Sequence, residues 1–412
     1  MPSPRAAVAR AFAGLPPVAR RDAEIRRLSG VVRKRARSLR KQRERVADLQ
    51  AEVAGLRAQV RREREKAVAH DTTSRERLAA LRSAKRRISR GAEPTFSALL
   101  AQQRSLYGRL RDTGGHAHHP MARTEYKLHN VAFTRSHGVP TAPVFQAWGT
   151  IDEIDLGSLP DEFVLKADGG ASARGVVPIR RTGGSLVRID TGERVSCDDI
   201  KDRLRAFGDR IRGPYFAEAL LPSSGGSPVP DDIKVYTFYG QPAQVLLMRP
   251  AGPRRRDAGR RYLDPVTGAD LGEVLPGVTY RPDIPVPDSL PEILAAARHL
   301  SLATGADFGR FDFYDTPDGI RFGEITPAPG DPQQYHLDHD LALGSAWLDA
   351  RVRVLQDEAA GRPRGLVWGA HPSAWLYPAG SEPDGMESWP RTVPGCDRWC
   401  VPSSPRAVAS PV

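Results

Sequence analysis

The 412-residue sequence has few cysteines and no long hydrophobic run. Three cysteines, Cys197, Cys396 and Cys400, are too few for a disulfide framework. Cys396 and Cys400 have three residues between them, and no second cysteine pair completes a zinc site, so free thiols are expected. No apolar stretch approaches the length of a membrane-spanning helix, and the N-terminus lacks the apolar segment of a signal peptide. A cytoplasmic protein without a transmembrane segment is therefore expected.

The N-terminal arm is poor in acidic residues, and residues 21–90 contain no Phe, Tyr or Trp. Residues 1–90 hold 26 Lys or Arg and 9 Asp or Glu, so this arm carries +17 and the remainder −5 of the total +12. A basic arm can bind phosphates, but the aromatic residues that stack on single-stranded bases are missing. Nucleic-acid binding is therefore possible but not favoured. The charged exterior of a coiled coil explains the charge, and attraction to an anionic polymer or a peripheral membrane surface is equally allowed.

A seven-residue pattern begins at Ile25 and favours a parallel two-stranded coiled coil with a homodimer as its consequence. The polar residues Arg35, Gln42 and Glu63 occupy some d positions, and a single long helix packed on its own domain is the alternative. The apolar a positions are Ile25, Val32, Leu39, Val46, Val53 and Val60, and the apolar d positions are Leu28, Leu49 and Leu56.

The rest of the chain alternates helices, strands and Gly/Pro turns, which predicts an α+β fold. Helices are expected at 95–111, 126–137, 198–210, 290–302 and 340–358, and strands at 163–166, 215–221, 233–239, 243–248, 308–314 and 320–325. The expected domains are a disordered N-terminus (1–20), a basic coiled-coil helix (21–90), a helical linker (91–120), an α+β domain (121–360) and a Pro/Gly-rich tail (361–412).

The first motif is Lys166 at the end of a strand, followed at once by the small-residue loop 168–176. Glycines let backbone N–H groups approach a phosphate chain, and a lysine beside them adds a point charge. The loop does not match a Walker A sequence, in which the lysine follows the glycines. A Gly-rich hairpin turn without a ligand is the alternative.

The second motif is a pair of strands that carries carboxylates on one face. Arg310, Asp312 and Tyr314 alternate with Phe311 and Phe313, which are expected to face the core. A turn at 316–320 places Asp312 opposite Glu324 on the partner strand, at about 5 Å. Two such carboxylates could share a hard cation. A plain salt bridge to Arg310 is the rival explanation.

These motifs, in this order, resemble the ATP-grasp superfamily. The segments 126–127, 137–143, 158–166, 230–234 and 322–330 are similar to its TupA-like branch, named for teichuronopeptide biosynthesis, over roughly residues 120–350. The resemblance implies an ATP-grasp fold, in which two α+β subdomains clasp a nucleotide, and it implies ATP and Mg²⁺ as cofactors. The sequence departs from the family pattern at one position, because many ATP-grasp enzymes have Asn two residues after the metal-binding Glu and this chain has Thr326, whose hydroxyl could ligate the ion or hold a water.

The resemblance also implies roles for individual residues. Lys127 and Lys166 match phosphate-contacting lysines, and Asp232 or Lys234 falls where a ribose or phosphate contact is expected. The remaining matches are the phosphate lid with Gly169, Gly170, Ala171 and Ser172, the adenine hinge Glu218, Ala219 and Leu220, the magnesium ligands Asp312, Glu324 and Thr326, and the phosphate clamps Arg249 and Arg310.

The resemblance implies an ADP-forming carboxylate–amine ligase that acts on a cell-envelope polymer precursor or a peptide. Such enzymes phosphorylate a carboxylate, and an amine then attacks the acylphosphate. Magnesium and lysines stabilise the transferring phosphoryl group, and a closing lid excludes water. Alternatives are a kinase on the same fold and a basic coiled-coil scaffold whose ATP-grasp domain is degenerate.

Overall fold

The computed structural model divides the chain into two compact units, Met1–Arg90 and Gly91–Val412. It describes residues 20–35, 37–41, six further positions between 45 and 59, and 94–114, 120–171, 173–223, 230–249, 258–330 and 333–401. Among these residues, no helix combines the length and the apolar character that crossing a bilayer requires.

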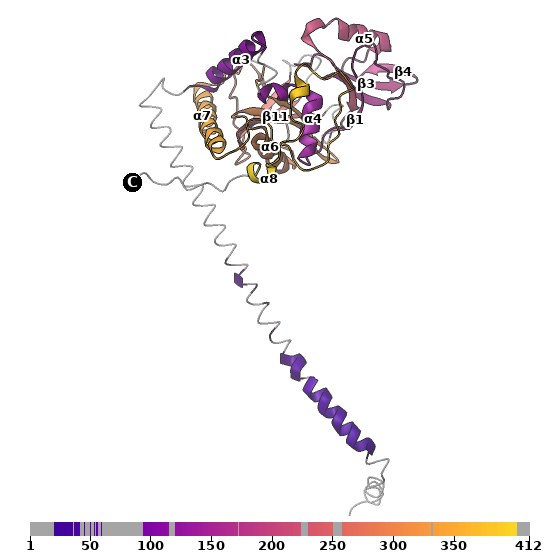
Figure 1. Ribbon diagram of the computed structural model, residues 1–412, viewed down its shortest axis with the longest axis vertical. Helices are drawn as coiled ribbons and strands as arrows, with labels where there is room; N and C mark the ends of the chain where they lie inside the picture. Colours follow the sequence, from indigo (N-terminus) through magenta and orange to yellow (C-terminus); the bar gives the residue numbers. More distant parts are fainter. Residues whose placement is uncertain are drawn as a thin grey trace, which may run out of the picture. The chain divides into compact units, whose positions relative to one another are not determined.

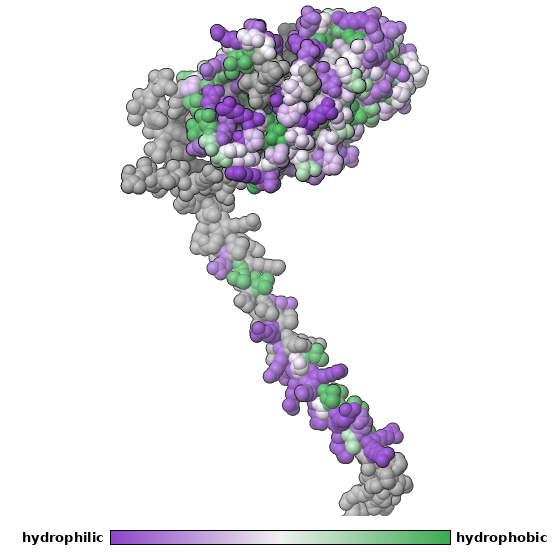
Figure 2. Space-filling model, in the orientation of Figure 1, coloured by the Kyte–Doolittle hydropathy of each residue, from purple (hydrophilic) through white to green (hydrophobic). Residues whose placement is uncertain are grey.

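In the first unit, residues 20–35 and 37–41 form a helix whose apolar side chains stand in solvent. Ile25 is 55% exposed and Val32 64% exposed, and Figure 2 shows hydrophobic residues spaced among hydrophilic ones along this helix. In a coiled coil, a second helix would cover this exposed apolar stripe. The structure contains one chain, so the dimer stays a prediction. Positions 46, 49 and 60 of the expected pattern lie outside the described residues.

In the second unit, drawn as a ribbon in Figure 1, the strands of the described residues form two sheets of six strands each by their hydrogen-bonded order. The first sheet is antiparallel throughout, with the strand order β1-β6-β2-β3-β4-β5. Its strands are β1 (Val144–Trp148), β2 (Glu162–Ala167), β3 (Val176–Thr182), β4 (Ser185–Arg188), β5 (Arg194–Val195) and β6 (Tyr215–Ala219). The helix α5 (Cys197–Arg205) begins with a capping box between Ser196 and Asp199 and packs Ile200 and Leu204 into this sheet's core.

The second sheet has the order β10-β9-β8-β7-β11-β12 and is antiparallel except between β9 and β10. Its strands are β7 (Asp232–Phe238), β8 (Gln241–Arg249), β9 (Gly259–Leu263), β10 (Thr279–Tyr280), β11 (Gly309–Thr316) and β12 (Gly319–Thr326). Alternation separates its two faces, because Ile233 and Val235 enter one hydrophobic cluster and Tyr236 enters another. Both faces are therefore covered.

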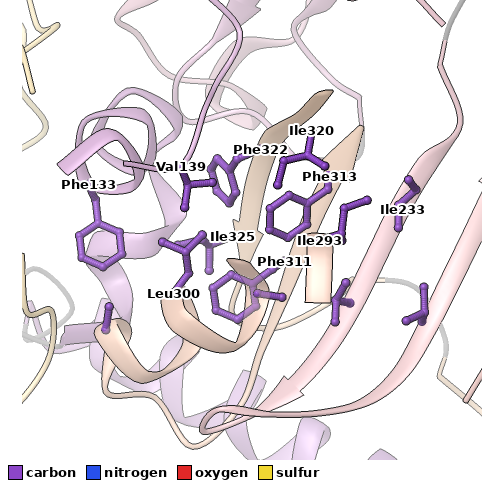
Figure 3. Packing of buried hydrophobic residues seen from close by; sticks show 14 of the residues in the cluster. Phe133, Val139, Ile233, Ile293, Leu300, Phe311, Phe313, Ile320, Phe322 and Ile325 are labelled. Carbon is purple, nitrogen blue, oxygen red and sulfur yellow. The ribbon is translucent and has the colours of Figure 1, made fainter. Parts of the chain in front are cut away.

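Helices from distant parts of the chain cover these faces. The helix α6 (Leu290–Thr304) packs Ile293 and Leu300 against Phe311 and Phe313, as Figure 3 shows. α3 (Phe96–Asp112) and α7 (Leu337–Ala359) contribute to the opposite cluster. The shorter helices are η2 (Pro120–Glu125), α4 (Lys127–Ser136), η3 (Gly208–Arg210), η5 (Met386–Ser388) and α8 (Cys396–Trp399).

Two segments expected to lie outside the folded domain contribute buried residues to it. Phe96, in the segment expected as a linker, is fully buried among aromatic rings that include Phe308 and Trp347. Val367 and Cys400, in the segment expected as a tail, belong to the cluster beneath α6. Residues 94–112 and 366–400 therefore form part of the packed unit.

Candidate active site

A cleft of about 430 Å³ brings together residues from α4, the loop after β2, and strands β11 and β12. It contains Lys127, Gly170, Arg310, Glu324 and Thr326 of the expected site. Six basic side chains line it against three carboxylates. The basic residues are Arg111, Lys127, Arg174, Arg210, Arg212 and Arg310, and the acidic ones are Glu125, Asp209 and Glu324. This excess of basic over acidic side chains favours the binding of an anionic ligand.

Lys127 is the first residue of α4, and its amine reaches the glycine-rich loop. Its Nζ donates hydrogen bonds to the backbone oxygens of Gly170 and of Asp168, the latter at 3.3 Å. Burial lowers the pKa of Lys127, while the nearby carboxylate of Glu324 opposes that change. The start of α4 is therefore tied to the loop through a lysine whose charge faces the cleft.

The glycines of the loop are required by close packing. A Cβ at Gly170 would lie 2.5 Å from the carbonyl oxygen of Arg174, and Gly175 adopts a φ of +73° with Ala167 directly beside it. Gly169 and Ala171 also line the cleft, while Ser172 lies outside the described residues. The loop therefore presents backbone close to the space in which an anion would bind.

Lys166 and the expected hinge lie on neighbouring strands of the first sheet. The register pairs Lys166 with Phe216 and Val164 with Glu218, so Lys166 and Glu218 share a face and form an ion pair. Ala219 donates its N–H to the carbonyl of Pro143 at 2.9 Å. Ala219 and Leu220 line a second cleft of about 320 Å³ rather than the first.

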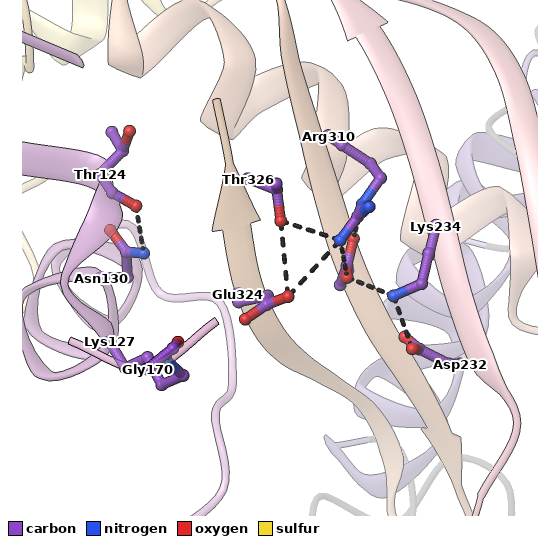
Figure 4. A network of polar contacts seen from close by, with 10 residues as sticks. Thr124, Lys127, Asn130, Gly170, Asp232, Lys234, Arg310, Glu324 and Thr326 are labelled. Atoms are coloured by element: carbon purple, nitrogen blue, oxygen red, sulfur yellow. Dashed lines mark hydrogen bonds and ion pairs between the residues drawn. The ribbon is translucent and has the colours of Figure 1, made fainter. Parts of the chain in front are cut away.

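The carboxylate pair lies in register as expected, with Asp312 opposite Glu324 across β11 and β12. Asp312 is 1% exposed and accepts two hydrogen bonds from Arg310, Nε to Oδ1 at 2.7 Å and a terminal nitrogen to Oδ2 at 2.8 Å. Lys234, 2% exposed, pairs with the same carboxylate (Figure 4). Burial alone would raise the pKa of Asp312, but Arg310 and Lys234 together hold it below its usual value.

Glu324 presents a loosely engaged carboxylate, and Thr326 presents a hydroxyl that Arg310 holds in place. The Oε1 atom of Glu324 is 3.5 Å from Arg310 and 3.4 Å from the Thr326 hydroxyl, and its side chain is 37% exposed. The Thr326 hydroxyl accepts a hydrogen bond from Arg310 at 2.9 Å. Two carboxylates and a hydroxyl on adjacent strands form an all-oxygen donor set, which fits Mg²⁺. Arg310 already contacts both oxygens of Asp312, Oε1 of Glu324 and the Thr326 hydroxyl, so a bound cation would share these oxygens with it.

Asp232 and Arg249 are the remaining residues of the expected site, and each pairs with a charged side chain of the protein. Asp232 pairs with Lys234 at 2.5 Å and so belongs to the buried network of Asp312. Arg249 forms a bidentate pair with Asp231, at 2.9 and 2.6 Å, at the end of β8. Arg249 is not among the residues that line the 430 Å³ cleft.

Sequence reasoning missed the role of Asp168, which joins three segments. It is fully buried and accepts hydrogen bonds from the Leu128 N–H at 2.7 Å and from the Tyr377 hydroxyl at 2.8 Å. The first contact caps the start of α4 beside Lys127. Asp168 directly follows the strand that carries Lys166, and this position in the sequence could have indicated a role at the site. The residues around Tyr377 in the sequence give no indication of its hydrogen bond to Asp168.

The pKa of Asp168 leads to a pH-dependent prediction. Burial raises it from 3.8 to about 6, so the folded protein binds the proton more tightly than the unfolded chain. Stability from this group is therefore full below about pH 4 and is lost as the pH rises through 6. Relative to Asp168→Asn, the wild type should lose about 2 kcal/mol of unfolding free energy between pH 4 and pH 7. Urea unfolding at both pH values measures this difference, and a constant difference would contradict it.

Comparison with known proteins places this geometry in a family. Residues 137–348, just over half of the chain, match the model of the TupA-like ATP-grasp family. The match begins after Lys127. No curated protein matches significantly.

Several solved structures are distantly similar. D-alanine–D-alanine ligase from Bacillus anthracis, complexed with ATP, is 14% identical, with 62% of this chain and 76% of that chain covered and a TM-score of 0.38. The ATP-grasp ligase PsnB with a phosphomimetic variant of its minimal precursor, Mg and ADP is 15% identical over 62% and 66%, with a TM-score of 0.31. D-alanyl-alanine synthetase A from Vibrio cholerae is 14% identical over 57% and 66%, with a TM-score of 0.33. The family match covers the strands of both sheets that carry the expected nucleotide and carboxylate residues apart from Lys127, and the chain belongs to the TupA-like ATP-grasp family.

Proposed function

We propose that this protein is a magnesium-dependent ATP-grasp ligase that joins a carboxylate to an amine and releases ADP and phosphate. The observation that carries the proposal is the cationic cleft in which Lys127, the glycine loop, Arg310 and Glu324 converge. Such a cleft suits a triphosphate and an anionic acyl substrate together. Phosphoryl transfer requires positioning and charge stabilisation and no nucleophilic side chain, which fits this residue set.

The nucleotide roles are proposed as follows. Lys127 and Lys166 contact phosphates, and the loop of Gly169, Gly170, Ala171 and Ser172 closes over them. Glu218, Ala219 and Leu220 form the adenine hinge, while Asp232 and Lys234 provide ribose or phosphate contacts. In the structure Lys166 pairs with Glu218 and Lys234 with Asp312, so nucleotide binding has to draw these lysines partly away from their carboxylates.

Asp312, Glu324 and Thr326 are the proposed ligands of magnesium. The bound ion supplies positive charge that stabilises the phosphates during transfer. Arg310 is a proposed catalytic residue because it reaches Asp312, Glu324 and Thr326 and also lines the cleft, so it can neutralise phosphate charge beside the ion. Arg249 is retained as a weaker catalytic proposal, because in the structure Asp231 engages its guanidinium.

The substrates are proposed from the family alone. The TupA-like branch points to a cell-envelope polymer precursor or a peptide as the source of the carboxylate, with an amine as acceptor. A kinase, which phosphorylates a hydroxyl, is the alternative, because it would bind ATP and magnesium with the same residues. A degenerate domain serving as a basic scaffold is less favoured, since the lysines, the loop and both carboxylates are all present.

The chemistry is tested by incubating the protein with ATP, magnesium and pools of carboxylates and amines. ADP release that depends on both substrates, with an amide product by mass spectrometry, is expected. Hydroxylamine should intercept the acylphosphate as a hydroxamate. A stable phosphate ester formed without amide or hydroxamate would identify a kinase instead. Absence of magnesium-dependent stabilisation by a non-hydrolysable ATP analogue, expected at about 2.7 kcal/mol at 100 times its Kd, would reject both.

The N-terminal helix is proposed to form a homodimer and to lie in a cytoplasmic or membrane-peripheral setting. Light scattering should give the full chain twice its monomer mass. Val32→Glu and Leu39→Glu together should produce monomers, because charges at a positions cannot pack in the seam. The matched variant Arg33→Glu changes a neighbouring position outside the a and d pattern and should remain dimeric. A monomeric wild type would eliminate the coiled-coil proposal.

A further inference from the structure

Four side chains of metal-binding type converge at a place where no function is assigned. Each of His137, His299, Cys396 and Cys400 offers one ligand atom, and these atoms all lie within 4.8 Å of one another. None of the four lines the 430 Å³ or the 320 Å³ cleft. The cluster is therefore separate from the residues proposed for ATP and magnesium.

Three of the distances within the cluster lie within about 0.4 Å of the edges of a tetrahedral zinc site. His137 Nδ1 lies 3.0 Å from His299 Nε2, and Cys396 Sγ lies 3.3 Å from the first nitrogen and 3.6 Å from the second. Zinc bonds of about 2.0–2.1 Å to nitrogen and 2.3 Å to sulfur imply edges of about 3.4 Å between nitrogens and 3.6 Å between nitrogen and sulfur. One ion could therefore contact these three atoms with small movements, and Cys400 supplies the fourth ligand.

Hydrogen bonding does not account for this convergence. Each imidazole nitrogen has either one lone pair or one proton, so it makes a single good hydrogen bond. His137 Nδ1 nevertheless faces both His299 Nε2 and Cys396 Sγ. A cation at the centre would accept one lone pair from each of the four ligand atoms at once.

The short helix α8 places the sulfur atoms of Cys396 and Cys400 on the same side. Cys396 begins the short helix α8 and Cys400 is its C-cap residue, so the two are one helical turn apart and share a face. His137 is the C-cap residue of α4, and His299 lies in α6. Three segments that are distant in the sequence therefore meet at this cluster.

The chemistry of the donors selects the metal. Thiolate and imidazole ligands in a tetrahedral arrangement favour Zn²⁺ over Mg²⁺ or Ca²⁺. Two thiolates balance the charge of the ion, and a neutral complex suits a place where Cys400 is 1% exposed and Phe133 packs on the His137 ring at 4.7 Å. Four protein ligands leave no open position, which is typical of structural and not catalytic zinc.

We propose that His137, His299, Cys396 and Cys400 bind a structural Zn²⁺ ion that fastens the C-terminal segment to α4 and α6. Free thiols were expected from the sequence because no second cysteine pair completes a zinc site. In the structure the further ligands are histidines, 97 and 259 positions away from Cys396. The ion would hold α8 in place, and with it the segment that carries Val367 and Tyr377. The proposal does not depend on the proposed ligase activity.

The test uses the full chain, purified under reducing conditions without a metal-affinity step. Elemental analysis should find about one zinc per chain. Cys396→Ser with Cys400→Ser should abolish zinc binding, whereas Cys197→Ser, which changes the cysteine outside the cluster, should retain it. With zinc bound, only Cys197 should react readily with a thiol reagent, and chelation should release the other two.

A second measurement keeps the proposal testable if the double variant fails to fold. Wild-type protein loaded with Co²⁺ should show the intense visible bands of a tetrahedral ion and thiolate-to-cobalt charge transfer. Chelation should lower the Tm, and added zinc should restore it. Zinc-supplied wild-type protein that binds no metal, or whose intact mass under non-reducing conditions shows a Cys396–Cys400 disulfide, would overturn the proposal.

Discussion

Asp312→Asn is expected to lower the free energy of unfolding by about 3–5 kcal/mol, because it leaves two buried cations without their shared anion. Arg310 and Lys234 are 5% and 2% exposed, and both pair with this carboxylate. The asparagine amide would also direct N–H groups toward N–H donors of the guanidinium or of the amine. The variant should lose nucleotide binding as well, since the same network borders the cleft through Arg310.

Urea unfolding at neutral pH, followed by far-ultraviolet circular dichroism, measures the loss. Asp318→Asn is the matched control, because it makes the same chemical change at the exposed turn of the same hairpin. That control should change stability by less than about 0.5 kcal/mol. If both variants are equally stable, Asp312 does not hold the buried network together.

The strand hairpin that carries this network could be predicted from the sequence, because its determinants are local. Alternating Phe311 and Phe313 fix the core face, and the turn near Pro317 pairs Thr316 with Gly319. A one-residue shift of the register between Asp312 and Phe313, which the sequence did not indicate, then puts Asp312 opposite Glu324. The strand that carries Lys166 was also predicted, since an apolar run stops near a glycine-rich loop, and in the structure it ends one residue later, at Ala167.

Contacts between distant segments could not be predicted in the same way. The bond from Tyr377 to Asp168 joins residues 209 positions apart, and Cys396 meets His137 across 259 positions. Neither pair produces a periodic or spacing signal. The double engagement of Asp312 by Arg310 and Lys234 depends on the pairing of β7 with β11, a register that the sequence of each strand alone does not specify.

Glu324→Gln is expected to have the opposite profile, a large loss of activity with little loss of stability. ADP release should fall by about 10²–10³-fold, the usual cost of removing one group that stabilises charge in a transition state. The neutral amide should also raise the magnesium concentration required for half-maximal rate. The folded state should lose less than about 1 kcal/mol, because exposed or loosely held ion pairs contribute little.

The structure explains why these two neighbouring carboxylates should differ. Asp312 is enclosed by two cations, whereas Glu324 is 37% exposed and has contacts of 3.4 and 3.5 Å only. Activity assays at several magnesium concentrations, with unfolding curves for both variants and for Glu273→Gln at an exposed position, separate the two roles. Full activity in Glu324→Gln would remove Glu324 from the proposed metal site. Unfolding of Glu324→Gln would mean that its charge supports Arg310 in the folded protein rather than a cation in the cleft.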